Sequence, residues 1–160
     1  MHVTRGYEKK KVVGPDAAIP HFRQQLAIVK AAKSRFDSSL FEIRQLVQAD
    51  LFDSELAAAE GLNKYKFARA AGALAGVVLE GHLAQVCHDR KLTISKKNPG
   101  ISDLNEVLKA GDVIDVPEWR FIQHLADIRN LCDHSKKPDP TAAQVADLID
   151  GVKKAIKTVF

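Results

Sequence analysis

Apolar residues recur every three or four positions along most of this 160-residue chain, which is the spacing of helices that bury one face. No segment shows the strict alternation expected of a half-buried strand. The longest regular run occupies residues 19–49 and holds a seven-residue repeat of Phe22, Val29, Phe36 and Ile43, with Leu26, Leu40 and Val47 between them and Lys33 in one slot. Such a narrow seam packs against another long helix, in this chain or in a partner, and we expect packing within the same bundle. The pattern predicts an all-α bundle of about five to six helices.

Composition fits a soluble globular protein, with 46% apolar and 28% charged residues. We expect one helical domain over residues 16–160, after a basic arm over residues 1–15 that either touches phosphates or is simply solvated. The net charge of +4 permits contact with nucleic acid without requiring it. Cys87 and Cys132 fall within helical patterns, and we expect buried thiols in a cytoplasmic protein. No apolar run has transmembrane length, so we expect no membrane association.

Capping residues, glycines and prolines mark the expected helix ends. The first helix is expected to break near residues 51–54, where Asp53 or Ser54 can cap the next helix. Asp103 is expected to cap a short helix, and Thr141 opens the last helix through a capping box. Between them we expect a short helix over residues 55–62, a central helix over residues 66–90, and a helix that begins near Pro117.

The central helix is apolar on more than one face, which predicts that other helices enclose it. Its three glycines, Gly72, Gly76 and Gly81, are expected where neighbouring backbones approach closely.

A cluster of polar residues ends the helix that follows Pro117, over residues 127–134. Arg129 supplies a permanent cation with a planar fork of donors suited to phosphate, and His134 can move a proton near neutral pH. Asn130 and His134 are four residues apart, so they share a face if the helix continues. Arg129 and His134 are five apart, roughly 140° around an ideal helix. Either the helix loosens near Asp133, or the two groups converge with help from a second copy.

These residues resemble a known family. Arg129, Asn130 and His134 are similar to the R-x4-6-H motif of the HEPN superfamily (higher eukaryotes and prokaryotes nucleotide-binding domains), including its polar residue after the Arg. Glu80 on the central helix resembles the acidic position often seen there in this family. The resemblance covers residues 57–160.

The resemblance implies a metal-independent endoribonuclease that needs no cofactor. The 2′-hydroxyl of the RNA attacks the adjacent phosphate, and one product carries a cyclic phosphate end. His134 is the candidate for proton transfer, and Arg129 for stabilising the charge that builds on the phosphate. Asn130 would orient His134 or bind the phosphate, while Glu80, Asp127 or Asp133 would hold Arg129 or tune His134.

The resemblance also implies a homodimer, with a composite site at the dimer interface. It suggests a toxin or defence effector, with an antitoxin or a nucleotidyltransferase as a further partner. His124 lies a turn before the motif and either lines the same cleft or is a polar-face residue. Four lysines stand in loops that could steer RNA phosphates, although solvated loop lysines are common; they are Lys96, Lys97, Lys136 and Lys137.

Alternatives follow from the same residues. Arg129 and Asp133 at i, i+4 could form a plain helix ion pair, and His134 could cap the helix end. The domain would then be a noncatalytic protein-interaction or nucleotide-binding module. His82, Cys87 and His88 fit no standard zinc spacing, so we expect no metal site. No Gly-rich phosphate loop, serine nucleophile motif or catalytically spaced carboxylate pair is present.

Overall fold

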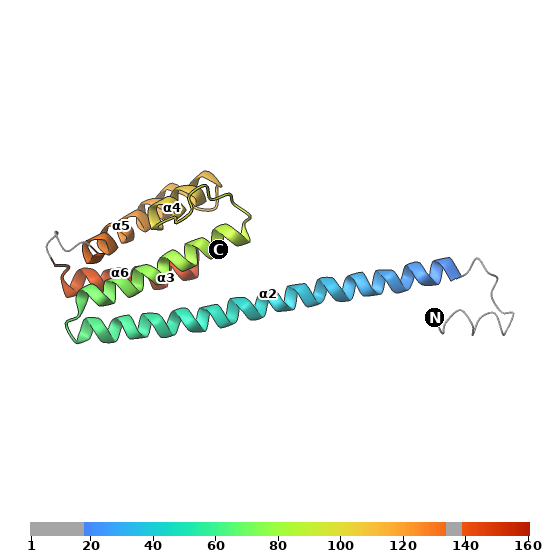
Figure 1. Ribbon diagram of the computed structural model, residues 1–160, viewed down its shortest axis with the longest axis horizontal. Helices are drawn as coiled ribbons and strands as arrows, with labels where there is room; N and C mark the ends of the chain where they lie inside the picture. The colour runs from blue at the N-terminus through green and yellow to red at the C-terminus, as the bar shows by residue number, and fades with distance from the viewer. Residues whose placement is uncertain (1–17, 134–138) are drawn as a thin grey trace. The chain divides into compact units, whose positions relative to one another are not determined.

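The computed structural model describes residues 18–133 and 139–160, apart from the side chains of Gln45 and Ala49 (Figure 1). The basic arm over residues 1–15, and His134, Lys136 and Lys137, lie outside the described residues. The predicted all-α fold is confirmed, and the described part contains no strand. In chain order the helices are α2 (Ala18–Lys64), α3 (Ala68–Asp89), α4 (Ile101–Ala110), α5 (Val116–Asp133) and α6 (Ala142–Thr158).

The chain divides into two compact units, Met1–Gln48 and Ala49–Phe160. The described part of the first unit is the N-terminal stretch of α2. The four members of its seven-residue repeat are each more than half exposed: Phe22, Val29, Phe36 and Ile43. The first unit by itself therefore leaves this seam uncovered.

The break expected near residues 51–54 is wrong, because α2 continues through them to Lys64. Phe52 and Leu56 are buried one helical turn apart, so the burial of this face holds the helix together. Asp53 and Ser54 are exposed and meet water without interrupting the backbone. A capping residue starts a new helix only when its side chain accepts hydrogen bonds from the free amides of that helix. Because α2 is continuous here, Asp53 and Ser54 have no free amides to cap.

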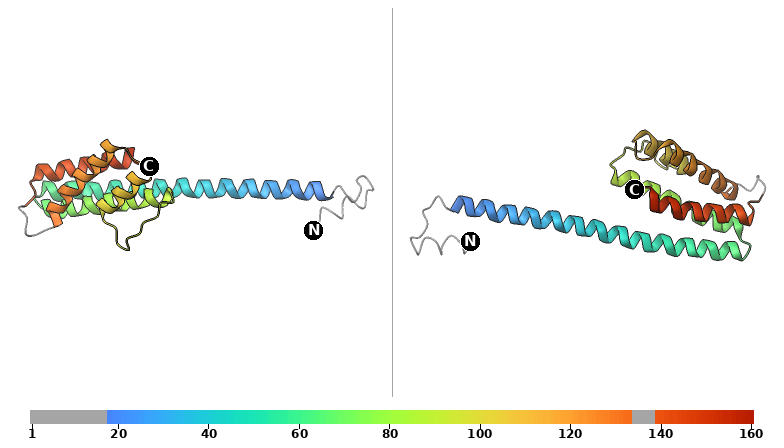
Figure 2. Two further views of the ribbon diagram at one scale, coloured as in Figure 1. Left: turned by 90° about the horizontal axis from the view of Figure 1, so that it is seen from above. Right: turned by 180° about the vertical axis from the view of Figure 1, so that it is seen from behind.

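Helix α3 lies at the centre of the second unit, where it packs against α4, α5 and α6 (Figures 1 and 2). Helix α5 also packs against α4 and α6, so the four helices share one apolar core. The largest fully buried side chains come from every helix of this unit and are Leu56, Leu79, Leu83, Leu104, Leu108, Ile122, Leu125, Leu148 and Ile149. Among the described helices, α3 alone is long and apolar enough to cross a membrane, and 56% of its apolar window is buried inside the bundle.

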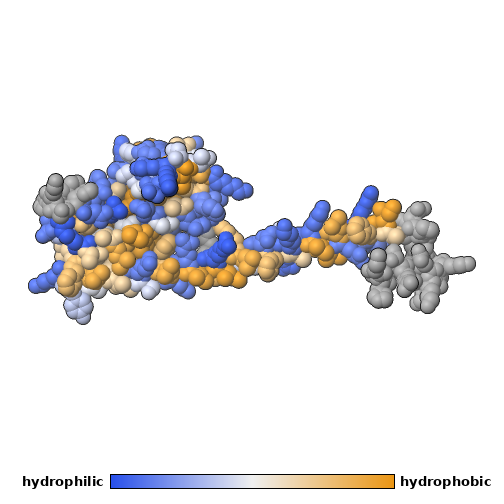
Figure 3. All heavy atoms as spheres, in the orientation of Figure 1, coloured by the Kyte–Doolittle hydropathy of each residue, from blue (hydrophilic) through white to orange (hydrophobic). Residues whose placement is uncertain are grey.

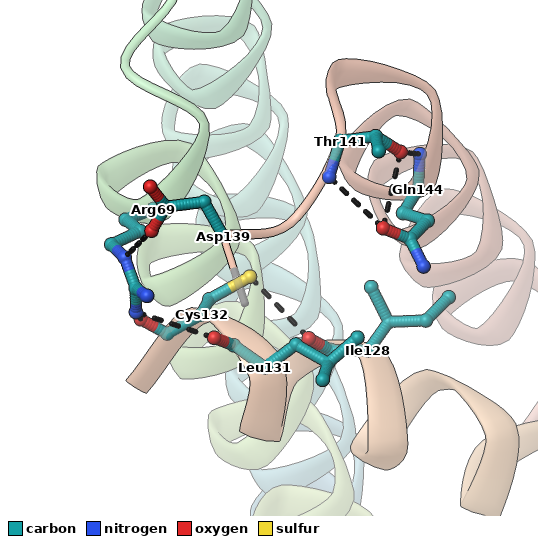
Figure 4. Close-up of polar contacts among 7 residues, drawn as sticks. All are labelled: Arg69, Ile128, Leu131, Cys132, Asp139, Thr141 and Gln144. Carbon is teal, nitrogen blue, oxygen red and sulfur yellow. Dashed lines mark hydrogen bonds and ion pairs between the residues drawn. The ribbon is translucent and has the colours of Figure 1, made fainter. Parts of the chain in front are cut away.

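The predicted capping box of the last helix is confirmed. The Thr141 side chain accepts a hydrogen bond from the Gln144 amide at 3.2 Å, and the Gln144 side chain accepts from the Thr141 amide at 2.9 Å (Figure 4). At α4 the expected cap is displaced by one turn. Gly100 is the N-cap, and the carboxylate of Asp103 reaches back to the Gly100 amide at 2.8 Å. Asp103 therefore satisfies a free amide from inside the first turn.

Candidate functional site

Arg129 lies in the last two turns of α5, and its guanidinium is held by carboxylates from two helices. Nη1 is 2.8 Å from Oδ2 of Asp133, one turn further along α5, and Nη2 is 3.8 Å from Oε2 of Glu80 on α3. Two of the three carboxylates expected to hold Arg129 therefore do so. The Arg129 side chain is 28% exposed, which leaves the guanidinium within reach of a ligand from solvent.

The stem of Arg129 crosses α3 over Gly76. A Cβ atom at Gly76 would overlap Cγ of Arg129, and Nε of Arg129 is buried there without a hydrogen-bond partner. One turn earlier on α3, a Cβ at Gly72 would overlap Sγ of Cys132. The two glycines thus form a flat strip against which the end of α5 packs. A close approach is therefore found at two of the three glycines, but it is made by side chains of α5 and not by a neighbouring backbone as expected. At Gly81 a Cβ would meet only Phe52, at 3.9 Å, so the expectation is wrong there.

Arg69, at the start of α3, binds the end of α5. Its Nη1 donates to the carbonyl of Cys132 at 3.0 Å and to that of Leu131 at 3.3 Å, while Nε donates to Asp139 (Figure 4). The last carbonyls of a helix lack partners within the helix and carry the negative end of its dipole, so a guanidinium is well placed there. Arg69 therefore connects residues on both sides of the 134–138 segment, which contains His134.

Arg69 was not expected to be a site residue, although the sequence contains a signal for it. Arg69, Gly72, Gly76 and Glu80 recur at three- and four-residue steps, so they form one stripe along α3. The stripe is polar and small on a helix that is otherwise apolar. Arg129 and Cys132 of α5 lie on it. A stripe of this composition on a buried helix indicates a facing element that carries charge.

The other expected site residues of α5 take no part in the ion pairs of Arg129 with Glu80 and Asp133. Asn130 follows Arg129 and is partly exposed. Asp127 and His124 are both exposed. Asp127 precedes Arg129 by two residues, which places them on roughly opposite sides of the helix. α5 ends at Asp133, so the angular conflict between Arg129 and a helical His134 concerns a residue beyond its last described turn.

The two loop lysines that the structure describes, Lys96 and Lys97, do not gather around Arg129. Lys96 and Lys97 lie between α3 and α4, beyond the opposite end of α3 from Arg69. Lys96 pairs with Asp103 at 2.7 Å, so it fastens this loop to α4. The structure brings together Arg129, Glu80 and Asp133 and leaves these two lysines at a distance from them.

Cys132 lies beneath the cluster and is buried. Burial raises the pKa of its thiol, and the nearby Asp133 carboxylate raises it further, against the opposing effect of Arg69 and Arg129. A thiol kept protonated is a poor nucleophile, so Cys132 serves to pack α5 against Gly72. Its Sγ donates to the carbonyl of Ile128 at 3.4 Å (Figure 4). The expectation of buried, unpaired thiols is confirmed for both cysteines.

The histidine of the central helix belongs to the core. His82 is buried, its Nε2 lies 2.9 Å from the carbonyl of Val159, and its ring meets Phe52 edge to face. Cys87 is buried as well, whereas His88 is exposed. Within the described ranges, no three His, Cys, Asp or Glu residues are arranged to hold a metal ion.

No family model, curated protein or solved structure matches this chain. The resemblance to the HEPN superfamily rests on Arg129, Asn130, His134 and Glu80.

Proposed function

We propose that this chain is a metal-independent endoribonuclease of the HEPN type. The observation that carries the proposal is the setting of Arg129. Its guanidinium is partly exposed between Glu80 and Asp133, at the end of the helix that precedes His134. Arg69 supports it by linking the carbonyls at the end of α5 to Asp139, on the other side of the segment that contains His134.

In the proposed reaction the 2′-oxygen of one nucleotide forms a bond to the adjacent phosphorus, and the bond from phosphorus to the 5′-oxygen breaks. A base takes the proton of the 2′-hydroxyl, and an acid gives a proton to the leaving 5′-oxygen. His134 is assigned one of these proton transfers and Asn130 its orientation. Arg129 would lie against the phosphate, where its charge stabilises the negative charge that develops on the nonbridging oxygens.

Binding of a phosphate requires Arg129 to exchange one carboxylate for it. The contact with Glu80 is the longer of the two, at 3.8 Å against 2.8 Å for Asp133. Glu80 is therefore the group that a phosphate would displace, while Asp133 keeps the side chain oriented. With Nη1 still paired to Asp133, Nη2 can donate a charge-assisted hydrogen bond to a phosphate oxygen in the place of Glu80.

One cut needs both an acid and a base, and each chain offers one histidine in the motif. We propose that the site is composite, with the α5 ends of two chains contributing to one cleft. A role as a toxin or defence effector follows from the family resemblance.

The test is cleavage of a randomised single-stranded RNA pool in the presence of a chelator. We expect the purified chain to produce ends with a 2′,3′-cyclic phosphate, and Arg129→Ala and His134→Ala each to lower the rate by about 100-fold or more. Arg120→Ala is the matched control, because Arg120 is an exposed residue of the same helix. It should leave the rate unchanged.

Substrates with 2′-deoxyribose at every position should stay intact, because the attacking hydroxyl is missing. Expression of the chain should slow cell growth, and either substitution should relieve the effect. Cleavage that survives Arg129→Ala and His134→Ala, or no cleavage of any RNA in the pool, would contradict the proposal.

A noncatalytic interaction domain is the second candidate, and a specific observation favours it. Both terminal nitrogens of Arg129 already face carboxylates, as they would if the residue only joined α5 to α3. This candidate predicts that Arg129→Ala lowers the free energy of unfolding, while RNA is never cut. Measuring stability and cleavage on the same variant separates the two functions.

A further inference from the structure

We infer that residues 22–47 of α2 pair with the same residues of a second copy of the chain in an antiparallel two-stranded coiled coil. The inference does not depend on the proposed function, because this segment precedes the region that resembles the HEPN superfamily. It concerns the first compact unit alone.

The segment belongs to a heptad seam over residues 19–47 that faces solvent. Its positions cover four heptads and span about 42 Å of helix, which is the length at which such a pattern predicts a coiled coil. Eight of its nine positions are apolar, and all eight are exposed: Ile19, Phe22, Leu26, Val29, Phe36, Leu40, Ile43 and Val47. Figure 3 shows hydrophobic residues interspersed with hydrophilic ones along this part of α2. A face of this length is stable in water only when another surface covers it.

The seam is complementary to itself when the second helix runs in the opposite direction. In the register centred between Ser34 and Arg35, Phe22 faces Val47 of the second copy, Leu26 faces Ile43, and Val29 faces Leu40. Each of these layers then combines a larger and a smaller side chain, or two of similar size. In the parallel arrangement each residue faces its own copy, so Phe22 and Phe36 crowd their layers while Val29 and Val47 leave theirs underfilled. Even filling favours the antiparallel arrangement.

Lys33, the single charged position of the seam, favours the same direction. A parallel pair places the ammonium group of Lys33 against that of its copy in a desolvated layer. In the antiparallel register Lys33 faces Phe36 of the second copy, twice by symmetry. Its aliphatic stem can cover the ring while the ammonium group reaches water or lies over the ring face.

The charged residues that flank the seam also favour the antiparallel arrangement. Lys30 lies next to Asp37 of the second copy in the antiparallel register, and this contact also occurs twice. The flanking contact of Arg23 with Arg44 is repulsive and offsets part of that gain. The parallel arrangement sets Lys30, Asp37 and Arg44 against uncharged residues and forms no opposite-charge pair of this kind.

Disulfide trapping tests the direction and the occupant together. Leu26→Cys and Ile43→Cys are made in separate full-length chains, mixed, and oxidised. The native thiols, Cys87 and Cys132, are buried and supply little background. The antiparallel pair predicts a crosslinked dimer only in the mixture, because position 26 faces position 43 and neither faces itself.

A seam-breaking substitution provides the control. Leu40→Glu would bury a carboxylate against Val29 of the second copy, in a layer that holds no cation, and should reduce the crosslinked yield by at least about tenfold. Ser38→Glu, on the opposite side of the helix, should leave the yield unchanged. Trp119 fluorescence follows unfolding of the second unit, and its melting should be the same in both variants, because neither substitution lies in that unit.

Crosslinking of Leu26→Cys with itself would establish a parallel pair and overturn the inference. Absence of any crosslink, together with a monomer in sedimentation, would overturn it as well, since the seam would then be covered by something other than a second copy.

Discussion

The side chain of Arg129 crosses helix α3 directly over the backbone of Gly76, where even a methyl group would overlap its Cγ. The contact couples two features that are far apart in the sequence. A glycine in the middle of a buried helix is unfavourable by about 1 kcal/mol relative to alanine. Here it leaves room for the arginine stem and so allows the guanidinium to reach Glu80 and Asp133.

Gly76→Ala should therefore destabilise the protein by up to about 2 kcal/mol, because overpacking costs about 1–3 kcal/mol and the better helix propensity of alanine returns about 1 kcal/mol. Urea denaturation followed by Trp119 fluorescence measures the change. The same substitution in an Arg129→Ala background should be stabilising, because all three of the nearest atoms around a Cβ at Gly76 belong to Arg129.

Gly81→Ala is the matched control on the same helix. A Cβ there meets only Phe52, at an ordinary contact distance of 3.9 Å, so the propensity gain should dominate and the protein should become more stable. Equal effects of the two alanines would mean that Arg129 moves aside without cost.

Acid should weaken the fold through His82. Burial lowers the pKa of His82, against smaller opposing effects of the Val159 and Ala155 carbonyls. The unfolded chain, with a His pKa of about 6.5, then binds a proton more readily than the native state does. The stability linked to His82 is therefore fully present above about pH 6.5 and falls as the pH drops from there toward its lower folded pKa.

Urea denaturation between about pH 5 and 7 should show this slope. His82→Gln, which keeps a side-chain amide able to donate to Val159, should flatten the slope. His88→Gln should preserve it, because His88 is exposed. The same slope in His82→Gln as in the wild type would rule out His82 as its source.

The three- and four-residue spacing of apolar residues predicted the helices of the second unit, because each of these helices is stabilised by burying one face. Cys132 was expected to be buried within a helical pattern, and it is buried, as is Leu125 seven residues earlier on α5. The break expected at Asp53 and Ser54 failed for the same reason. Local capping preference is weaker than the burial of Phe52 on the same helix, and a one-dimensional pattern does not show which effect dominates.

The candidate site was predictable in part. The carboxylates of Glu80 and Asp133 were expected to hold Arg129. Asp133 follows Arg129 by four residues on the same helix, and Glu80 resembles the acidic position of the HEPN central helix. The role of Arg69 was not, because its hydrogen bonds go to backbone carbonyls of Leu131 and Cys132. A carbonyl leaves no signature in the side-chain sequence, so only the packing of α3 on α5 reveals the contact.

Arg69 should stabilise the fold mainly through those carbonyls. The Asp139 side chain is 82% exposed, so its ion pair with Arg69 is screened by water and should contribute less than about 1 kcal/mol. Arg69→Gln should lower the free energy of unfolding by more than Asp139→Asn does. The double variant measures the coupling energy, which should stay below about 1 kcal/mol. A larger coupling would assign the main contribution to the ion pair.

Charge reversal beside the seam of α2 should report the direction of pairing. In the antiparallel register Lys30 lies beside Asp37 of the second copy, and each contact occurs twice per dimer. Asp37→Lys turns two attractive pairs into two repulsive ones, each worth about 0.2–1 kcal/mol, so the Kd of the pair should rise several-fold at low salt. Lys30→Asp should have a similar effect, and the double variant that exchanges the two charges should recover the wild-type Kd, because the opposite charges again face each other.

Arg35→Asp, at a position outside the seam and its flanks, should change the Kd little. Sedimentation equilibrium at low and high salt measures each Kd, and salt should shrink the differences through screening. A parallel pair places Asp37 beside Ala32 instead, so single reversals that leave the Kd unchanged would contradict the antiparallel register.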